Sequence, residues 1–408
     1  MQYTAYDKKV DEYIKKNYLD KIVKSFVNDL GTNLISTILF GGFGKGEGSI
    51  QFVDDKPVPY NDFDLYVVTK KKLTDKELDR ISMNASKKIG MGGLEVAYYP
   101  EEGYDSNKFF HVDVRCIPYN KLNKLMNIQR YYELKYGSQV IQGNDKVLDK
   151  INIINPDKIP LSEGLRNLFN KLHTMLLGLR KEYNEDQRKI RIFWSYKCYL
   201  SICEALLILS RRFEPTSLER AGLFSEIYKK NFPDLYEKIP DLPEKVRKAT
   251  NFKLKLNFNI DHNELWQTAL KDILIVFEYY LRKVTGINNV SYAINRKLPY
   301  TYFKPYLEEK IGINLFPSQY MLNLGYFDIL RKNDNFYLPP LLNWKDVGLR
   351  MILPIYFLLK DSQNTGNNNL DKAYNELKKF IRVDGMDFWH LREKSLKAYG
   401  LYYEQRLL

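Results

Sequence analysis

Three aspartates stand where their carboxylates could act together on a charged substrate. Asp62 and Asp64 are separated by one residue in the run "NDFDLYVV", and Asp113 lies in a second apolar run, "FFHVDVRCI". Both runs are typical of β-strands, in which residues i and i+2 point to the same face. Carboxylates placed in this way repel each other unless a cation lies between them. The spacing therefore predicts a site for divalent metal ions, which prefer oxygen ligands.

Asp113 also has a simpler interpretation. Arg115 follows it by two residues and shares its strand face, so a surface salt bridge between the two would explain the aspartate without any chemistry. For Asp113 alone, this interpretation is favoured. The Asp62–Asp64 pair earlier in the chain favours the metal site instead.

A glycine-rich segment, residues 41–48, precedes the aspartates and contains five glycines in eight residues. A Walker loop needs Ser or Thr after Lys45, where Gly46 stands. A dinucleotide fingerprint, GxGxxG, would need its third glycine at position 47 or 49, where Glu47 and Ser49 stand, so it is also excluded. The later motifs of protein kinases are absent from the sequence. What remains is a strand, a Gly-Gly turn and a second strand, and glycines let backbone N–H groups approach a triphosphate closely.

These elements resemble the DNA polymerase β-like nucleotidyltransferase superfamily. Its signature is an apolar residue, Gly, Gly or Ser, a spacer, Asp-x-Asp, and a third Asp on a later strand. Residues 40–42 are similar to the first part, residues 61–65 to the second, and Asp113 to the third. The resemblance implies that Asp62 and Asp64 bind two Mg²⁺ ions, for which Mn²⁺ could substitute. It also implies that Asp113 binds the catalytic ion and helps to activate the attacking hydroxyl.

The resemblance covers roughly residues 34–118 and has one departure. The spacer between Gly42 and Asp62 is 19 residues, longer than the family usually shows, and residues 48–60 look like an inserted β-hairpin. Outside the signature, residues 197–213 resemble a helix whose lysine reaches the triphosphate in some two-domain members. The nucleotide-binding residues implied in this way are Gly41, Gly42, Lys45, Ser49 and Lys197.

The elements around these residues alternate in the first part of the chain. Helical periodicity or capping signals predict helices over 8–29, 74–90 and 121–137, and strands are expected over 34–40, 62–68, 93–99 and 109–117. From about residue 155 the segments carry helical spacing only. We therefore predict an α+β protein, with a small mixed-sheet nucleotidyltransferase domain over 1–154 and a mostly α-helical region over 155–408. A further boundary is expected near 290–300.

The net charge is +13, and its distribution is uneven. Residues 1–150 carry +2, so the remaining residues carry +11. One interpretation is a solvated, lysine-rich helical surface. The other is a contact between the helical half and RNA or another polyanion, which a positive field attracts. The same balance disfavours a cationic aminoglycoside as substrate.

The sequence also bears on the protein's location. The longest purely apolar run, residues 351–359, is about half of the roughly 20 residues that span a bilayer, so no membrane association is expected. The first residues show no secretory signal, and the three cysteines form no CxxC pair. A reducing cytoplasm is therefore predicted. The sequence does not fix the oligomeric state.

The function expected from the resemblance is metal-dependent transfer of a nucleoside monophosphate from an NTP, with ATP as the expected donor, to an acceptor hydroxyl. RNA, a protein side chain, another nucleotide or a small sugar all remain open as acceptors. The alternative is a catalytically silent nucleotide-binding or antitoxin-like module of the same fold.

Overall fold

The computed structural model describes residues 1–60, 62–90, 112–298, 317–332, 337–342, 347–363 and 368–403. These residues form two compact units. The first contains the described residues up to 160 together with residues 210–260, and the second contains residues 161–209 and the described residues from 261 onward. The chain thus leaves the first unit after Pro160 and returns to it at Ser210. The predicted domain boundary near residue 155 stays a prediction.

The first unit is built on a four-stranded sheet with the order β5-β4-β1-β6. β4 runs parallel to β5, whereas β1 is antiparallel to both β4 and β6, so the sheet is mixed. The strands are β1 (Leu34–Leu39), β4 (Phe63–Thr69), β5 (Val112–Pro118) and β6 (Gln139–Gly143). A mixed sheet followed by mostly helical chain confirms the predicted α+β class.

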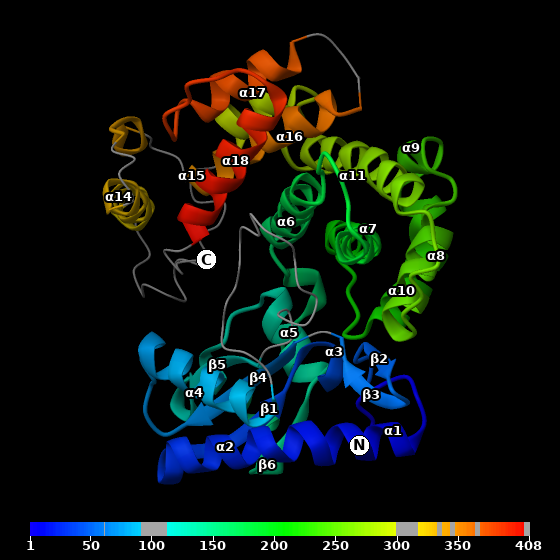
Figure 1. Ribbon diagram of the computed structural model, residues 1–408, viewed down its shortest axis with the longest axis vertical. Helices are drawn as coiled ribbons and strands as arrows, with labels where there is room; N and C mark the ends of the chain where they lie inside the picture. The colour runs from blue at the N-terminus through cyan, green and yellow to red at the C-terminus, as the bar shows by residue number, and fades with distance from the viewer. Residues whose placement is uncertain are drawn as a thin grey trace. The chain divides into compact units, whose positions relative to one another are not determined.

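Helices cover the sheet of the first unit. They are α1 (Lys8–Ile14), α2 (Asp20–Leu30), the short α3 (Gly41–Gly44), α4 (Asp75–Lys88) and α5 (Gln129–Tyr136). α2 packs against α4, and α4 packs against β5 (Figure 1). The predicted helix over 74–90 is confirmed, and it begins at a capping box in which the side chains and backbone N–H groups of Thr74 and Glu77 bond reciprocally.

The predicted inserted hairpin is confirmed. β2 (Ile50–Val53) pairs antiparallel with β3 (Lys56–Pro59). Asp54 and Asp55, which form the turn, have φ angles of 48° and 58°. Two successive positive φ angles belong to the turn type whose twist matches that of the flanking strands. The insertion is therefore a small structured element between the glycine-rich segment and β4.

Two strand predictions fall wholly or partly outside the described residues. The strand expected over 93–99 lies outside them, and so do the first three residues of the strand expected over 109–117. The remainder of that second strand is β5, which contains Asp113.

Residues 210–260 add three helices to the first unit. They are α8 (Ser217–Asn231), α9 (Pro233–Tyr236) and α10 (Leu242–Leu254). α8 packs against α10, and a capping box at Thr216 fixes the first turn of α8. Tyr132 of α5 donates a hydrogen bond to the carbonyl of Phe213 over 3.0 Å, so this segment is joined to the α5 region.

The second unit is helical wherever the structure describes it, as predicted. Its helices are α6 (Leu161–Leu177), α7 (Glu185–Leu209), α11 (His262–Thr285), α12 (Val290–Tyr292), α14 (Pro317–Lys332), α15 (Val347–Arg350), α16 (Ile352–Asp361), α17 (Asn369–Leu377) and α18 (Phe388–Tyr403). α7 packs against both α6 and α11. By length and composition α7 could cross a membrane, but 72% of its most apolar window is buried inside the protein, as in the core helix of a soluble protein.

Candidate active site

Strand register brings two of the three predicted aspartates together. Asp64 on β4 and Asp113 on β5 are direct partners in the parallel pair, so their side chains leave the same face of the sheet. Asp62 precedes β4 and is two residues from Asp64. Both neighbours of Asp64 in β4, Phe63 and Leu65, are buried in the core, whereas Asp64 and Asp113 are partly exposed. The core therefore fixes β4 and leaves its acidic face accessible.

The glycine turn lies directly against Asp64. Gly41 has φ of +63°, and a Cβ placed on it would lie 2.1 Å from Asp64 Oδ2. The N–H of Phe40 donates to the carbonyl of Asp64 over 2.9 Å. The turn needs glycine at this position for both reasons, the left-handed backbone and the close approach of the carboxylate.

Much of the glycine-rich segment is already bonded to itself. The N–H groups of residues 44–47 donate to carbonyls of residues 40–43, and the N–H of Gly48 donates to the carbonyl of Tyr3. A phosphate would therefore have to meet the start of the turn, at Gly41 and Gly42, rather than the whole segment.

Arg115 forms the salt bridge that the sequence offers as the simpler explanation of Asp113. Its Nη2 lies 3.1 Å from Asp113 Oδ2 and its Nε lies 3.4 Å from the same oxygen. Burial alone would lower the pKa of Arg115, but Tyr66, Asp113 and Asp64 outweigh it and raise that pKa above its ordinary value. The carboxylates of this face therefore further stabilise a guanidinium that is charged at any ordinary pH.

The donor set of this face fits a hard divalent cation, because it consists of carboxylate oxygens in register on adjacent strands. The side chains are not arranged around such an ion, however. In the part of the chain that the structure describes, no three His, Cys, Asp or Glu side chains lie close enough together to hold a metal. Asp113 is bonded to Arg115 instead. Asp62, Asp64 and Asp113 thus remain predicted ligands.

Lys45, a predicted phosphate ligand, is bonded inside the protein. Its ammonium lies 2.8 Å from Glu133 Oε2, and its side chain is only 5% exposed. Arg220 of α8 lies 2.7 Å from the other oxygen of Glu133. Burial raises the pKa of Glu133, but the two cations outweigh this effect and lower that pKa to about 2. The ion triad joins the glycine-rich segment to α5 and α8.

Glu47 makes a second set of buried contacts two residues later. Its oxygens accept hydrogen bonds from the N–H groups of Ser217 and Leu218, both at 3.0 Å. These N–H groups lie in the first turn of α8 and have no acceptor within the helix. Lys253 of α10 lies 2.7 Å from Glu47 Oε2. Burial raises the pKa of Glu47, but Lys253 and the two N–H groups together lower it to about 2. Ser49, another predicted phosphate ligand, donates to the carbonyl of Lys253 over 2.7 Å.

We call Lys45, Glu47, Glu133, Arg220 and Lys253 the buried ion cluster. It contains three cations and two anions, and it fixes the end of the glycine-rich segment to residues 210–260. Lys45 and Ser49 remain predicted nucleotide ligands. In this structure the Lys45 ammonium is bonded to Glu133 within the cluster, and the Ser49 hydroxyl donates to the α10 backbone.

Lys197, the remaining predicted nucleotide ligand, lies on α7 in the second unit. Its ammonium is 4.5 Å from the centroid of the Phe193 ring. The role assigned to it by resemblance stays a prediction.

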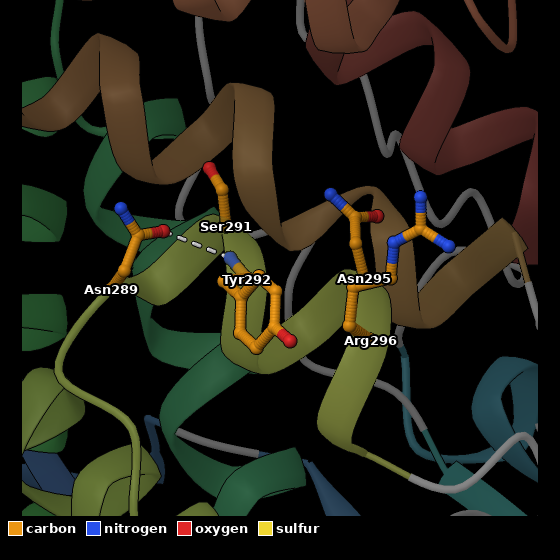
Figure 2. A pocket seen from close by; sticks show the side chains of 5 residues that line it. All are labelled: Asn289, Ser291, Tyr292, Asn295 and Arg296. Atoms are coloured by element: carbon orange, nitrogen blue, oxygen red, sulfur yellow. Dashed lines mark hydrogen bonds between the residues drawn. The ribbon is translucent and has the colours of Figure 1, made fainter.

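A pocket of the second unit has a different character. It has a volume of about 440 Å³ and is lined by Asn289, Ser291, Tyr292, Asn295 and Arg296 (Figure 2). The Asn289 side chain accepts the N–H of Tyr292 over 2.9 Å and caps α12. These five residues offer amides, hydroxyls and one guanidinium but no carboxylate, so their donor set does not suit a divalent metal.

No family model matches the chain, and no curated protein matches it. Among solved structures the chain is similar to spectinomycin adenyltransferase AAD(9) from Enterococcus faecialis, crystallised with ATP and spectinomycin. The sequence identity is 13%, the TM-score is 0.35, and the match covers 62% of this chain and 97% of that one.

Replacing Gly41 by alanine should destabilise the protein strongly. A non-glycine residue with this φ costs about 1–2 kcal/mol, and the new Cβ would also displace the Asp64 carboxylate. Urea unfolding of Gly41→Ala measures the total. Gly286→Ala is the matched control, because Gly286 has φ of +73° with nothing within 4 Å of a Cβ. Equal losses in the two variants would show that the contact with Asp64 is unimportant.

Acid should weaken the fold between about pH 4.5 and pH 2. Glu47 and Glu133 have pKa values of about 2 in the folded protein, against 4.5 ordinarily. Between these values the unfolded chain binds more protons, so the free energy of unfolding falls as the pH falls. Each carboxylate contributes on the order of 3 kcal/mol above that window. Urea unfolding at a series of pH values measures the slope.

The Glu47→Gln variant should show a shallower pH slope over the same window, because one of the two shifted groups is gone. Glu226→Gln provides the control, since Glu226 is 72% exposed and lies 3.8 Å from Arg212. Its slope should match that of the wild type. A wild-type slope in Glu47→Gln would mean that Glu47 does not titrate with folding.

Proposed function

We propose that this chain is a metal-dependent nucleotidyltransferase that transfers a nucleoside monophosphate from an NTP, with ATP as the expected donor, to an acceptor hydroxyl. The observation that carries the proposal is the register of β4 and β5, which sets Asp64 beside Asp113. Asp62 stands two residues from Asp64, and the Gly41 turn abuts the Asp64 carboxylate. The turn that we propose to bind phosphate therefore lies beside the acidic strand face.

Each residue of the site has a proposed task. Asp62 and Asp64 would hold the metal ions together with Asp113, and Gly41 and Gly42 would let the triphosphate approach the sheet. When bound, two Mg²⁺ ions would stabilise the charge that develops on the attacking and leaving oxygens.

The reaction would be a displacement at the α-phosphorus. The acceptor oxygen forms a bond to that phosphorus, the bond to the oxygen bridging the α- and β-phosphates breaks, and pyrophosphate leaves. Both hydrogen bonds from Arg115 end on Asp113 Oδ2. Oδ1 of Asp113 is therefore the atom that would take the proton of the acceptor hydroxyl.

The net charge and the cysteines bear on two further parts of the proposal, the class of partner and the cellular compartment. The +13 charge supports a polyanionic partner over a cationic aminoglycoside. A cytoplasmic location is supported by the spacing of the three cysteines, which form no CxxC pair. Incubation with each labelled NTP and a cell extract would identify the donor and the labelled acceptor.

The alternative is a silent nucleotide-binding or antitoxin-like module. The full set of three aspartates favours the enzyme, because a silent module has no need to keep carboxylates that repel each other. Titration calorimetry with ATP and Mg²⁺, followed by a pyrophosphate-release assay, separates the two. Binding without any pyrophosphate release would identify the silent module.

Neutralising either aspartate of the Asp-x-Asp pair should abolish turnover. Asp62→Asn and Asp64→Asn each remove a predicted metal ligand while relieving repulsion, so the metal-free protein should be no less stable than the wild type. Pyrophosphate release and thermal melting without metal test both statements. A large loss of melting temperature in either variant would mean that the aspartate is structural.

Asp113→Ala should lower kcat by about 100-fold or more with a smaller change in NTP affinity, because the loss concerns proton transfer in the transition state. If Asp113 serves only its salt bridge with Arg115, the rate should be normal and stability should fall by at most about 1 kcal/mol. Steady-state kinetics on both proteins decides between these outcomes. An unchanged kcat would contradict the assigned role of Asp113.

A further inference from the structure

The acidic face already contains a cation of its own. Asp64 and Asp113 are register partners on adjacent strands, and like charges directly opposite each other destabilise a sheet. Arg115 is two residues after Asp113 and therefore leaves the same face of β5. It grips Asp113 Oδ2 through two nitrogens, at 3.1 Å and 3.4 Å. The protein thus offsets the repulsion between its carboxylates without any metal.

The position of Arg115 relates it to both carboxylates. It is the partner of Tyr66 in the β4–β5 register, one pair beyond Leu65–Val114 and two pairs beyond Asp64–Asp113. Its side chain is 40% exposed and that of Asp113 is 33% exposed, so the guanidinium has solvent into which it can move.

We propose that Arg115 is the resident counter-ion of the Asp64–Asp113 pair, and that a divalent cation competes with Arg115 for Asp113 Oδ2. This inference rests on the proposed function in taking these carboxylates as the metal ligands. An ion that reaches Asp113 must displace the guanidinium. By linkage, Arg115 weakens metal binding by the same factor by which the metal weakens the Arg115–Asp113 contact.

The competition has a consequence for the free enzyme. Without Arg115 the two carboxylates would be an attractive site for any divalent ion. With Arg115 in place, one of the two negative charges is balanced in the absence of metal, so the repulsion between the carboxylates is reduced. Arg115 is thus a positioning residue for Asp113 and sets the affinity of the metal site.

A plain surface salt bridge would not behave in this way. Such a pair adds little stability and has no specific effect on metal binding. A general loss of positive charge would also tighten metal binding slightly, wherever the charge stood. The test therefore needs a control variant that loses one positive charge elsewhere in the protein. It also needs a background in which residue 113 carries no charge for Arg115 and the metal to compete for.

The experiment measures Mn²⁺ affinity by titration calorimetry on the full-length protein, without nucleotide. Arg115→Gln should tighten Mn²⁺ binding by about fivefold or more, which is within the usual range of coupling between two sites. It should also lower the melting temperature of the metal-free protein. Arg130→Gln is the control. It removes the same charge from α5, outside the two strands that carry the carboxylates, so it should change Mn²⁺ affinity by less than about twofold and leave the melting temperature unchanged.

A double-mutant cycle distinguishes direct competition from a through-space charge effect. In an Asp113→Asn background, Arg115→Gln should change Mn²⁺ affinity by less than about twofold, because the side chain of residue 113 is no longer charged. An equal gain in both backgrounds, or no gain in Arg115→Gln, would overturn the proposal. If Arg115→Gln does not fold, Arg115→Lys replaces it. Arg115→Lys keeps the charge but loses the two-nitrogen grip, and it should also bind Mn²⁺ more tightly than the wild type.

The measured Mn²⁺ affinities do not depend on whether the protein turns over an NTP. Failure of every variant to bind Mn²⁺ would overturn the competition. The predicted pattern of Mn²⁺ affinities together with no pyrophosphate release from any NTP would instead contradict only the transferase function.

Discussion

The parallel pairing of β4 with β5 is the constraint on which the candidate site depends. A shift of one residue in that register would turn Asp113 away from Asp64, since neighbouring residues of a strand face opposite sides. The register is held by apolar residues rather than by the aspartates. Phe63, Leu65 and Val67 of β4 are almost fully buried. The core thus forces together two carboxylates that would separate if they were free to do so.

The glycine turn lies against the acidic strand face, and the buried ion cluster fixes the segment that follows the turn. Gly41 allows the turn to lie against Asp64, and Glu47 and Lys45 fix the far end of the same segment to helices of the first unit. The charges of the cluster are costly to bury, and breaking one such pair leaves its partner uncompensated. A segment that is flexible by composition is thereby held in one conformation.

Local patterns in the sequence predicted a substantial part of this arrangement. Strand alternation placed Asp64 on one strand and Asp113 on another, as observed, although Asp62 lies just before β4 rather than in it. The inserted hairpin expected within residues 48–60 is also present. The same alternation put Arg115 beside Asp113, so their salt bridge was foreseeable as well. The roles of these residues in catalysis stay predictions.

Local sequence patterns could not predict the buried ion cluster. Lys45 and Glu133 are 88 residues apart, Glu133 and Arg220 are 87 apart, and Glu47 and Lys253 are 206 apart. No periodicity in a window of ten or twenty residues links such partners. The residue type alone also does not tell whether a Lys or Glu side chain is buried, because burial depends on partners that are distant in the sequence. The return of residues 210–260 to the first unit was missed for the same reason.

That return affects how the protein is made. A ribosome adding about 5–20 residues per second needs roughly ten to forty seconds to pass from Glu47 to Lys253. During that interval the emerging amino-terminal sheet carries Glu47 and Glu133 without the cations of α8 and α10 that neutralise them. The first unit can reach its final state only after the α6–α7 segment of the second unit has already left the ribosome. The nascent first unit therefore cannot complete these buried contacts until synthesis passes residue 253.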